Sequence, residues 1–304
     1  MKKSSFRSFI WIAFYVAFMW ACQKENISKN PSPAQAKLAA EDNAQIVAAT
    51  QEVMSITAGA MGQENVMGGR IADGDHPDGD HQGEDADDNR GCKPSIKATF
   101  SLDNSHTDSL IYSGSFTIDF GDGSTCMDST HMRTGKITDT YQYIVSFKDS
   151  VQFSSTETIT FDAFHLDTVQ VDGTIIIKAS SNTPTTVETQ DAKITYADGT
   201  STTWSGILTY HHQKGIGRHW RGKSIMVTGS LTGTNRHGLA FTATISKDIV
   251  YQFGCFGKNR FIPVSGTVDI VIGGVTSTVD YGDGTCHKHC TITADGKTEE
   301  HDND

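Results

Sequence analysis

The sequence predicts an all-β protein: an antiparallel meander forming a sandwich or a strongly curved sheet, with one amphipathic helix near the N-terminus. Three observations support this fold class. Between residues 92 and 298, apolar residues repeatedly alternate with polar ones, which is typical of strands with one face on a core. Asp-Gly pairs, which favour tight hairpins, separate these stretches. Apolar residues make up 37% of the 304 residues, enough for a sizeable core.

The charge balance argues against one class of partner. The formal net charge of the chain is −11. Residues 1–21 hold three of the 25 basic residues and no acidic one, so 22 basic and 36 acidic side chains remain after them, a net charge of −14. A general nucleic-acid binder needs positive charge to displace phosphate counterions. We therefore expect no nucleic-acid partner.

The first 21 residues are expected to be a signal peptide. A basic start precedes an apolar run over residues 9–21, which is shorter than the roughly 20 residues that span a bilayer. Cys22 follows, and then QKEN. This resembles the Bacteroidota lipoprotein pattern, in which such a stretch after the lipid-modified cysteine marks cell-surface lipoproteins. The resemblance implies palmitate on Cys22 and a membrane anchor on the outer face of the outer membrane; the alternative is ordinary cleavage that leaves Cys22 free.

The next segments differ in character. Residues 22–35 are polar with two prolines and are expected to be a tether. Residues 36–58 have apolar residues at helical spacing in an Ala-, Glu- and Gln-rich background, which predicts a helix docked on the main domain. Residues 59–91 lose this periodicity, and 73–88 contain eight carboxylates. Such a run repels itself, so we expect an acidic disordered linker.

Residues 92–298 are expected to form the β-domain, with about ten to twelve strands, and residues 299–304 a polar tail. Apolar side chains sharing one strand face recur throughout the domain: Phe116, Ile118 and Phe120; Tyr141, Tyr143, Val145 and Phe147; Trp204, Leu208 and Tyr210; Phe241, Ala243 and Ile245; and Val268, Ile270 and Ile272. Because polar residues lie between them, one face of the sheet is predicted to meet a core.

Two segments of this domain, DFGDGSTC and DYGDGTC, are similar to each other, and they end in Cys126 and Cys286. Each has another cysteine upstream at a similar distance, Cys92 and Cys255. The symmetry predicts disulfides Cys92–Cys126 and Cys255–Cys286 in an oxidising compartment. Other pairings stay open, and Cys290 is left over.

Five motifs occur in order along the domain: IDFGDGSTC, RTGKI, ADGTSTTW, TGSLTGTNRHG and DYGDGTC. This ordered set resembles an uncharacterised family of Bacteroidota lipoproteins. The resemblance implies the lipoprotein address and the β architecture, and carries no activity. Locally, DFGDG is also similar to the motif of PKD-type extracellular β-sandwich domains.

The CHKHC strand near the C-terminus is one candidate metal site. On a strand, His287 and His289 point the same way, and such a pair can chelate zinc or copper, with Cys290 as a further candidate ligand. The alternative is an exposed strand whose histidines face water.

Calcium is a weaker alternative at the Asp-Gly turns, where Asp119 with Asp122, or Asp280 with Asp283, offers paired carboxylates. The same residues are explained more simply as hairpin formers. No cofactor is expected, with zinc, copper and calcium left as open alternatives.

A basic and aromatic segment, residues 203–224, is the candidate ligand-binding site. It holds four basic residues, three histidines and three aromatic residues but no acid. Rings stack on sugar faces, and guanidinium groups bind carboxylates or sulfates, which suits a glycan or an anion. The candidate residues are Trp204, Tyr210, Arg218, Trp220 and Arg221. The alternative is that Trp204 and Tyr210 belong to the core.

Sequence motifs for catalysis are absent: there is no nucleophile elbow, HExxH, phosphate loop or dinucleotide-binding glycine pattern. A carboxylate pair for glycoside hydrolysis needs only proximity in space, so enzymatic activity stays open but is not favoured. We expect a lipid-anchored envelope protein with a binding or structural role, whose partner is an extracellular glycan or an envelope protein. The alternatives are a glycan- or anion-binding adhesin module using residues 203–224 and a metal-dependent site at CHKHC.

Overall fold

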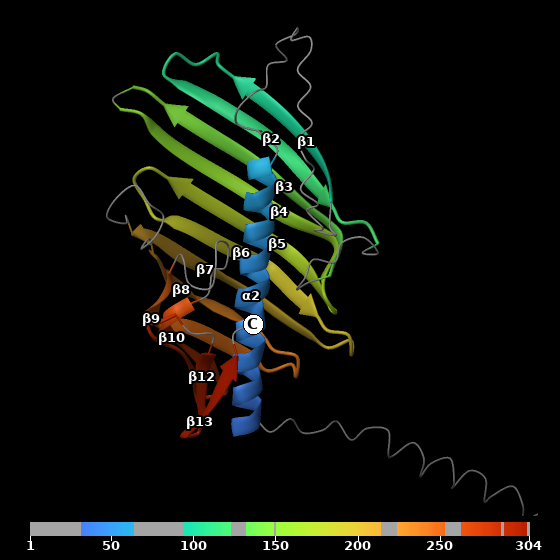
Figure 1. The fold of residues 1–304 in the computed structure, drawn as a ribbon, viewed down its shortest axis with the longest axis vertical. Coiled ribbons are helices and arrows are strands. Elements are labelled where there is room, and N and C mark those ends of the chain that lie inside the picture. The colour runs from blue at the N-terminus through green and yellow to red at the C-terminus, as the bar shows by residue number, and fades with distance from the viewer. Residues whose placement is uncertain are drawn as a thin grey trace, which may run out of the picture.

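The computed structural model describes residues 32–63, 94–122, 132–148, 150–213, 224–252, 263–286 and 289–302. These residues form one helix and thirteen strands (Figure 1). The helix is α2 (Pro33–Gln63), and the strands are β1 (Ser95–Asp103), β2 (Ser109–Asp119), β3 (Arg133–Ser146), β4 (Gln152–Leu166), β5 (Val169–Ser180), β6 (Thr185–Thr195), β7 (Ser201–Gln213), β8 (Ser224–Thr234), β9 (Ala240–Gln252), β10 (Pro263–Ile272), β11 (Val275–Asp283), β12 (His289–Ala294) and β13 (Lys297–Asp302).

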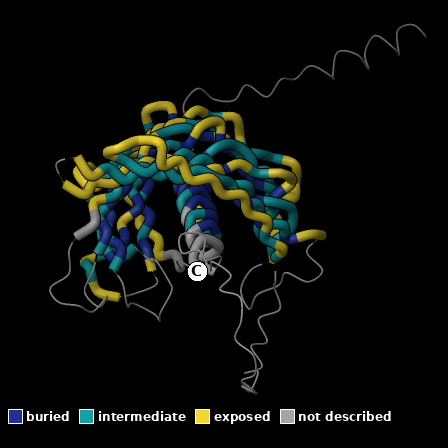
Figure 2. Tube along the Cα trace, turned by 90° about the horizontal axis from the view of Figure 1, so that it is seen from above, coloured by how far each residue is buried: buried dark blue, intermediate teal, exposed yellow. Residues whose placement is uncertain are grey.

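All thirteen strands belong to one antiparallel sheet, and their order in the sheet is their order in the sequence. The predicted all-β class with an N-terminal helix is confirmed. Of the two architectures expected, the strongly curved sheet is present: seen from above, the sheet arches over α2 (Figure 2). Large twisted sheets curl rather than stay flat, which makes the inner face concave. β1 and β13 are the two edges.

Helix α2 lies across the strands on the concave face (Figure 1), with β10, β11 and β12 as its nearest strands. It is longer than the predicted 36–58 and takes in the ends of the expected tether and linker. Its start is fixed by a reciprocal cap: Gln35 N donates to Ser32 Oγ at 3.4 Å, and Ser32 N donates to Gln35 Oε1 at 2.8 Å. Pro33 occupies the first helical position, where no intrahelical N–H bond is lost.

The core lies between α2 and the inner face of the sheet, in two clusters. One surrounds Ile46 of α2 and includes Trp204 and Ile270; the other surrounds Val53 and includes Phe116 and Ile137. The predicted alternation therefore identifies the inner face. Phe147 is an exception, because its side chain is 47% exposed near the end of β3.

The expected polar tail at 299–304 is wrong in part, because β13 extends to Asp302. Its KTEEHD sequence lacks apolar alternation, and pairing with β12 over six residues supplies the order instead. No helix in the described part of the chain has the length and apolarity to cross a bilayer. The predicted signal peptide, Cys22 and the bulk of the acidic linker lie outside the described residues.

Candidate functional site

Two carboxylates lie close together on the inner face of the sheet, Asp139 on β3 and Glu157 on β4. The period of β3 points Ile137, Asp139 and Tyr141 to the same side, and Ile137 is fully buried there. Tyr141 is opposite Glu157 in the β3–β4 register, so Glu157 is the diagonal neighbour of Asp139. Sequence analysis missed this pair. The sequence signal that could have revealed it is Asp139, an acid at an inward-facing position of an alternating strand.

Asp139 is buried without a partner. Its relative exposure is 0%, and neither carboxylate oxygen has a hydrogen-bond partner. Burial, together with the nearby charge of Glu157, raises the pKa of Asp139 to about 7. An ionised carboxylate is costly in such a place unless a donor or a cation meets it. Asp139 is therefore poised to accept a proton or a positive charge.

Glu157 is half-buried beside two tyrosines. Tyr143 Oη donates to Glu157 Oε1 at 2.7 Å, and the rings of Tyr141 and Tyr143 are 5.4 Å apart. Burial raises the pKa of Glu157, and the hydrogen bond from Tyr143 opposes this shift. Burial also raises the pKa of both tyrosines, so they stay neutral.

No described basic residue forms an ion pair with either acid of this cluster, Asp139 or Glu157. Arg133, on the same strand as Asp139, instead forms an ion pair with Glu52 of α2. Together with the two tyrosines, Asp139 and Glu157 are termed the acidic pair site below.

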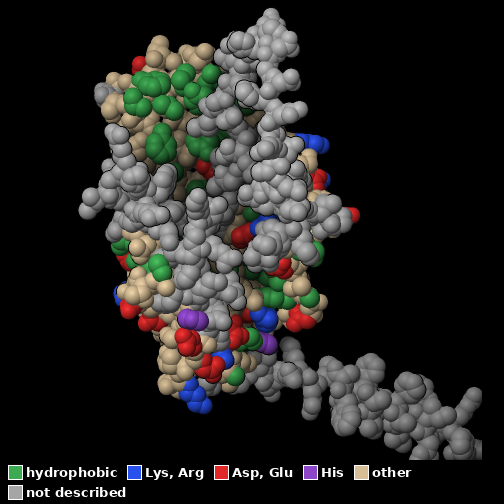
Figure 3. Space-filling view, in the orientation of Figure 1, with side chains coloured by type: hydrophobic (Ala, Val, Ile, Leu, Met, Phe, Trp, Pro, Cys, Tyr) green, Lys and Arg blue, Asp and Glu red, His purple; other side chains and the backbone are tan. Residues whose placement is uncertain are grey.

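An exposed apolar surface lies at the end of the same sheet region, towards the β1–β2 and β3–β4 loops. We call it the apolar rim. Its side chains are Phe100, Leu102, Phe147, Val151 and Phe153, which are 53%, 45%, 47%, 75% and 47% exposed. Figure 3 shows hydrophobic side chains gathered at the upper end of this face. Contiguous exposed apolar surface marks an interaction site more often than chance exposure does.

The acidic pair site and the apolar rim are continuous across the strands. Tyr112 of β2 is opposite both Leu102 of β1 and Tyr143 of β3, and the rings of Phe100 and Tyr112 are 6.0 Å apart. The inner face of β1–β4 therefore passes from an exposed apolar end to two carboxylates.

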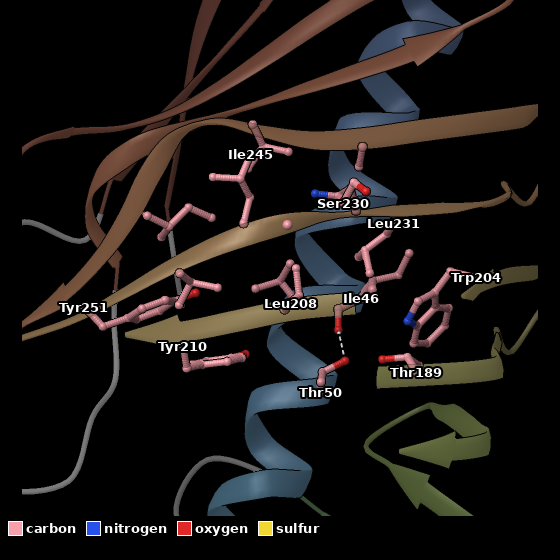
Figure 4. A pocket seen from close by; sticks show the side chains of 17 residues that line it. Ile46, Thr50, Thr189, Trp204, Leu208, Tyr210, Ser230, Leu231, Ile245 and Tyr251 are labelled. Atoms are coloured by element: carbon pink, nitrogen blue, oxygen red, sulfur yellow. Dashed lines mark hydrogen bonds between the residues drawn. The ribbon is translucent and has the colours of Figure 1, made fainter. Parts of the chain in front are cut away.

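A separate cavity of about 30 Å³ lies under α2, between the helix and β6–β10 (Figure 4). Its lining is largely apolar, and Asn43 Oδ1 and Trp204 Nε1 there have no hydrogen-bond partner. The volume suits about two water molecules rather than an organic ligand. This cavity is part of the core and is not the candidate site.

The predicted ligand site in residues 203–224 is placed only in part. Trp204 is 4% exposed and Tyr210 is half-buried, and both side chains line the cavity under α2 (Figure 4). Their positions agree with the core alternative. Arg218, Trp220 and Arg221 lie outside the described residues.

The predicted metal ligands do not converge where the structure describes them. His289 and Cys290 are consecutive on β12, so their side chains point to opposite faces. The imidazole of His289 is about half exposed and 3.9 Å from Glu300, whereas Cys290 is a buried free thiol. His287 lies outside the described residues, which contain no group of three His, Cys, Asp or Glu side chains able to hold a metal.

The first aspartate of each of the two similar segments accepts a hydrogen bond from the backbone N–H two residues further on. Asp119 Oδ1 accepts from Gly121 N at 2.9 Å, and Asp280 Oδ1 accepts from Gly282 N at 2.8 Å. The two segments therefore share this local hydrogen bond. Cys286, which ends the second segment, is disulfide-bonded. The proposed partners Cys92, Cys126 and Cys255 lie outside the described residues.

The TNRHG motif has a structural role in docking α2. Arg236 Nε donates to Asp42 Oδ1 at 2.7 Å, and the guanidinium lies 3.9 Å from the ring centre of Tyr196. Asp42 is 1% exposed, and Thr202 Oγ1 also donates to it, at 3.4 Å. Asn235 Oδ1 shapes the loop by accepting two backbone N–H groups. The motif thus connects the β8–β9 loop to the helix.

No family model, curated protein or solved structure matches this chain. Function is therefore inferred from the acidic pair site and the apolar rim.

Proposed function

We propose that this chain is a cell-envelope binding protein that holds a positively charged, partly apolar ligand on the inner face of β1–β4. One observation carries the proposal: Asp139 and Glu157 are neighbours on an aromatic and apolar surface, and no described basic residue neutralises them. A ligand cation would supply the missing counter-charge.

The chemistry suits an ammonium or guanidinium group joined to an apolar body. Carboxylates form their strongest hydrogen bonds with cationic donors, and tyrosine faces attract cations. Glu157 is the partly exposed acid, and its diagonal neighbour Asp139 is fully buried. The apolar rim would cover the uncharged part of the ligand, releasing water from both surfaces.

Binding should depend on pH. A cation beside Asp139 favours its ionised form and lowers its pKa, so binding expels a proton when the acid is protonated beforehand. Glu157, Tyr141 and Tyr143 are the titratable groups that act on Asp139 or neighbour it, and the tyrosines stay neutral. Affinity is therefore expected to increase as the pH rises through about 7.

Titration calorimetry with three probes tests the proposal: n-octylammonium, n-octanol and n-octyl sulfate share a chain and differ in head charge. We expect the ammonium to bind best and the sulfate worst. Glu157→Gln and Asp139→Asn should abolish this preference. Matched controls are Asp162→Asn and Glu188→Gln, which remove the same charge from the outer face of β4 and β6. Equal affinity for the three probes, or equal loss in the control variants, would refute the proposal.

We also propose, from the sequence, that Cys22 is lipidated and places the domain on the exterior of the outer membrane, in keeping with the lipoprotein resemblance. An alkyne fatty acid should be incorporated into the parent protein, and Cys22→Ala should abolish this incorporation. Incorporation that persists in the variant would contradict the proposal.

The disulfides Cys92–Cys126 and Cys255–Cys286 are also proposed from the sequence. Peptide mapping without reduction should recover both pairs, and a bond from Cys286 to another partner would overturn this pairing.

A further inference from the structure

The two edges of the sheet differ in chemistry. β13 is six residues long, and five of them are Lys, Glu, Glu, His and Asp. Glu299 of this edge also pairs with Lys37 of α2. Short, charged edge strands resist pairing with another chain. This edge is therefore closed to further strands.

β1 has the opposite character. It is nine residues long without proline or glycine, and its only charged residues are Lys97 and Asp103. It pairs with β2 without a register shift, so its outer backbone edge is regular. All but one of its residues are exposed, including Phe100 and Leu102. Among the described residues, no strand covers its other side. Such an edge is a template for another strand.

The sequence of β1 is complementary to itself. When two copies pair antiparallel with Phe100 on the two-fold axis, Lys97 of each copy lies opposite Asp103 of the other. On the inner face Ala98 meets Leu102, and the two Phe100 rings are adjacent. Directly opposite residues share a face of the sheet, and this register keeps the inner faces of both copies on one side.

We infer that two copies of this chain associate through their β1 strands. The interface is isologous, because the same edge serves both copies and the Lys97–Asp103 ion pair forms twice. It joins the two sheets into one, and it brings the exposed apolar side chains of Phe100 and Leu102 of both copies together. It does not depend on the proposed cation binding.

A charge-complementation experiment tests this register. Lys97→Asp carries two acids at the paired positions, and Asp103→Lys carries two bases. Each variant alone would place like charges opposite each other twice, so its dimer should dissociate about tenfold more readily or not form. Mixed in equal amounts, the two variants regain both ion pairs and should form heterodimers.

Sedimentation velocity and native mass spectrometry of the secreted chain, over a concentration series, provide the measurement. Glu300→Lys on β13 is the control for a charge reversal at the other edge and should dimerise like the parent. Asp103 Oδ1 also accepts from Ser105 N at 2.9 Å, so circular dichroism must first show that Asp103→Lys is folded.

A concentration-dependent parent dimer, two weakened variants and a heterodimer in the mixture would support the inference. A parent protein that stays monomeric would overturn the inference and leave the β1 edge to a different partner. Folded variants that dimerise as well as the parent, or that fail to form heterodimers, overturn it as well.

Discussion

Replacing Asp139 by Asn should stabilise the protein at high pH and not at low pH. In the unfolded chain this carboxyl titrates near its ordinary value of 3.8, and in the folded protein burial and Glu157 raise its pKa to about 7. Below pH 4 both states hold the proton, so the acid carries no ionisation cost. As the pH rises towards 7, the unfolded state loses its proton first and becomes relatively more stable.

The size of the effect follows from the shift. The difference between a pKa of 3.8 in the unfolded chain and about 7 in the folded protein costs the folded state about 4 kcal/mol once Asp139 is ionised. Asn has nearly the same shape and does not titrate. The amide of Asn leaves unmade hydrogen bonds at every pH. Only the ionisation of Asp139 in the parent therefore makes the stability difference between parent and variant depend on pH.

Urea unfolding at several values between pH 4 and pH 8, followed by circular dichroism, measures this difference. The free energy of unfolding of Asp139→Asn, relative to the parent, should rise by about 4 kcal/mol over this range. Asp162→Asn, which removes an exposed carboxylate of β4, should follow the parent closely. Parallel curves for parent and Asp139→Asn would refute the proposed environment of Asp139.

Three further outcomes are expected. Arg236→Ala should lower the free energy of unfolding by about 3 kcal/mol, because it leaves the carboxylate of Asp42 buried without its cation; a loss under 1 kcal/mol in urea unfolding would contradict this. Phe164→Ala should cost about 3–5 kcal/mol in the same assay, because a 0% exposed ring leaves a cavity. The thiol of Cys290, buried and with a raised pKa, should resist a thiol-reactive dye until urea unfolds the chain, and rapid labelling of the native protein would show that the site is open.

Local sequence pattern predicted the strands and the helix well. Alternation around Phe116, Tyr141 and Ile270 identified inward positions because a strand with one buried face repeats every two residues. The same logic failed at β13, where all six residues are polar and only pairing with β12 reveals a strand. Curvature was less predictable, because the choice between a sandwich and a curved sheet depends on twist summed over many strands.

The candidate site was predicted less well. Asp139 lay within reach of sequence reasoning, since it interrupts an inward-facing apolar series on β3. Its neighbour Glu157 depends on the β3–β4 register, which one sequence does not reveal. Conversely, the basic residues that follow Trp204 suggested that it belongs to a surface site. In the structure its position on β7 directs the side chain into the core.

The meander has a consequence for the order in which the chain folds. Every strand pairs with its neighbours in sequence, so each hairpin can form with little loss of loop entropy as soon as its two strands are available. The helix is the exception: α2 comes first in the chain, yet its nearest strands, β10–β12, are among the last. Until those strands have paired, only the half of α2 around Val53 has its core partners, which lie on β2–β6. Docking of the whole helix is therefore expected to be the final step, and a chain interrupted before β10 should retain sheet structure with the Ile46 half of the helix incompletely packed.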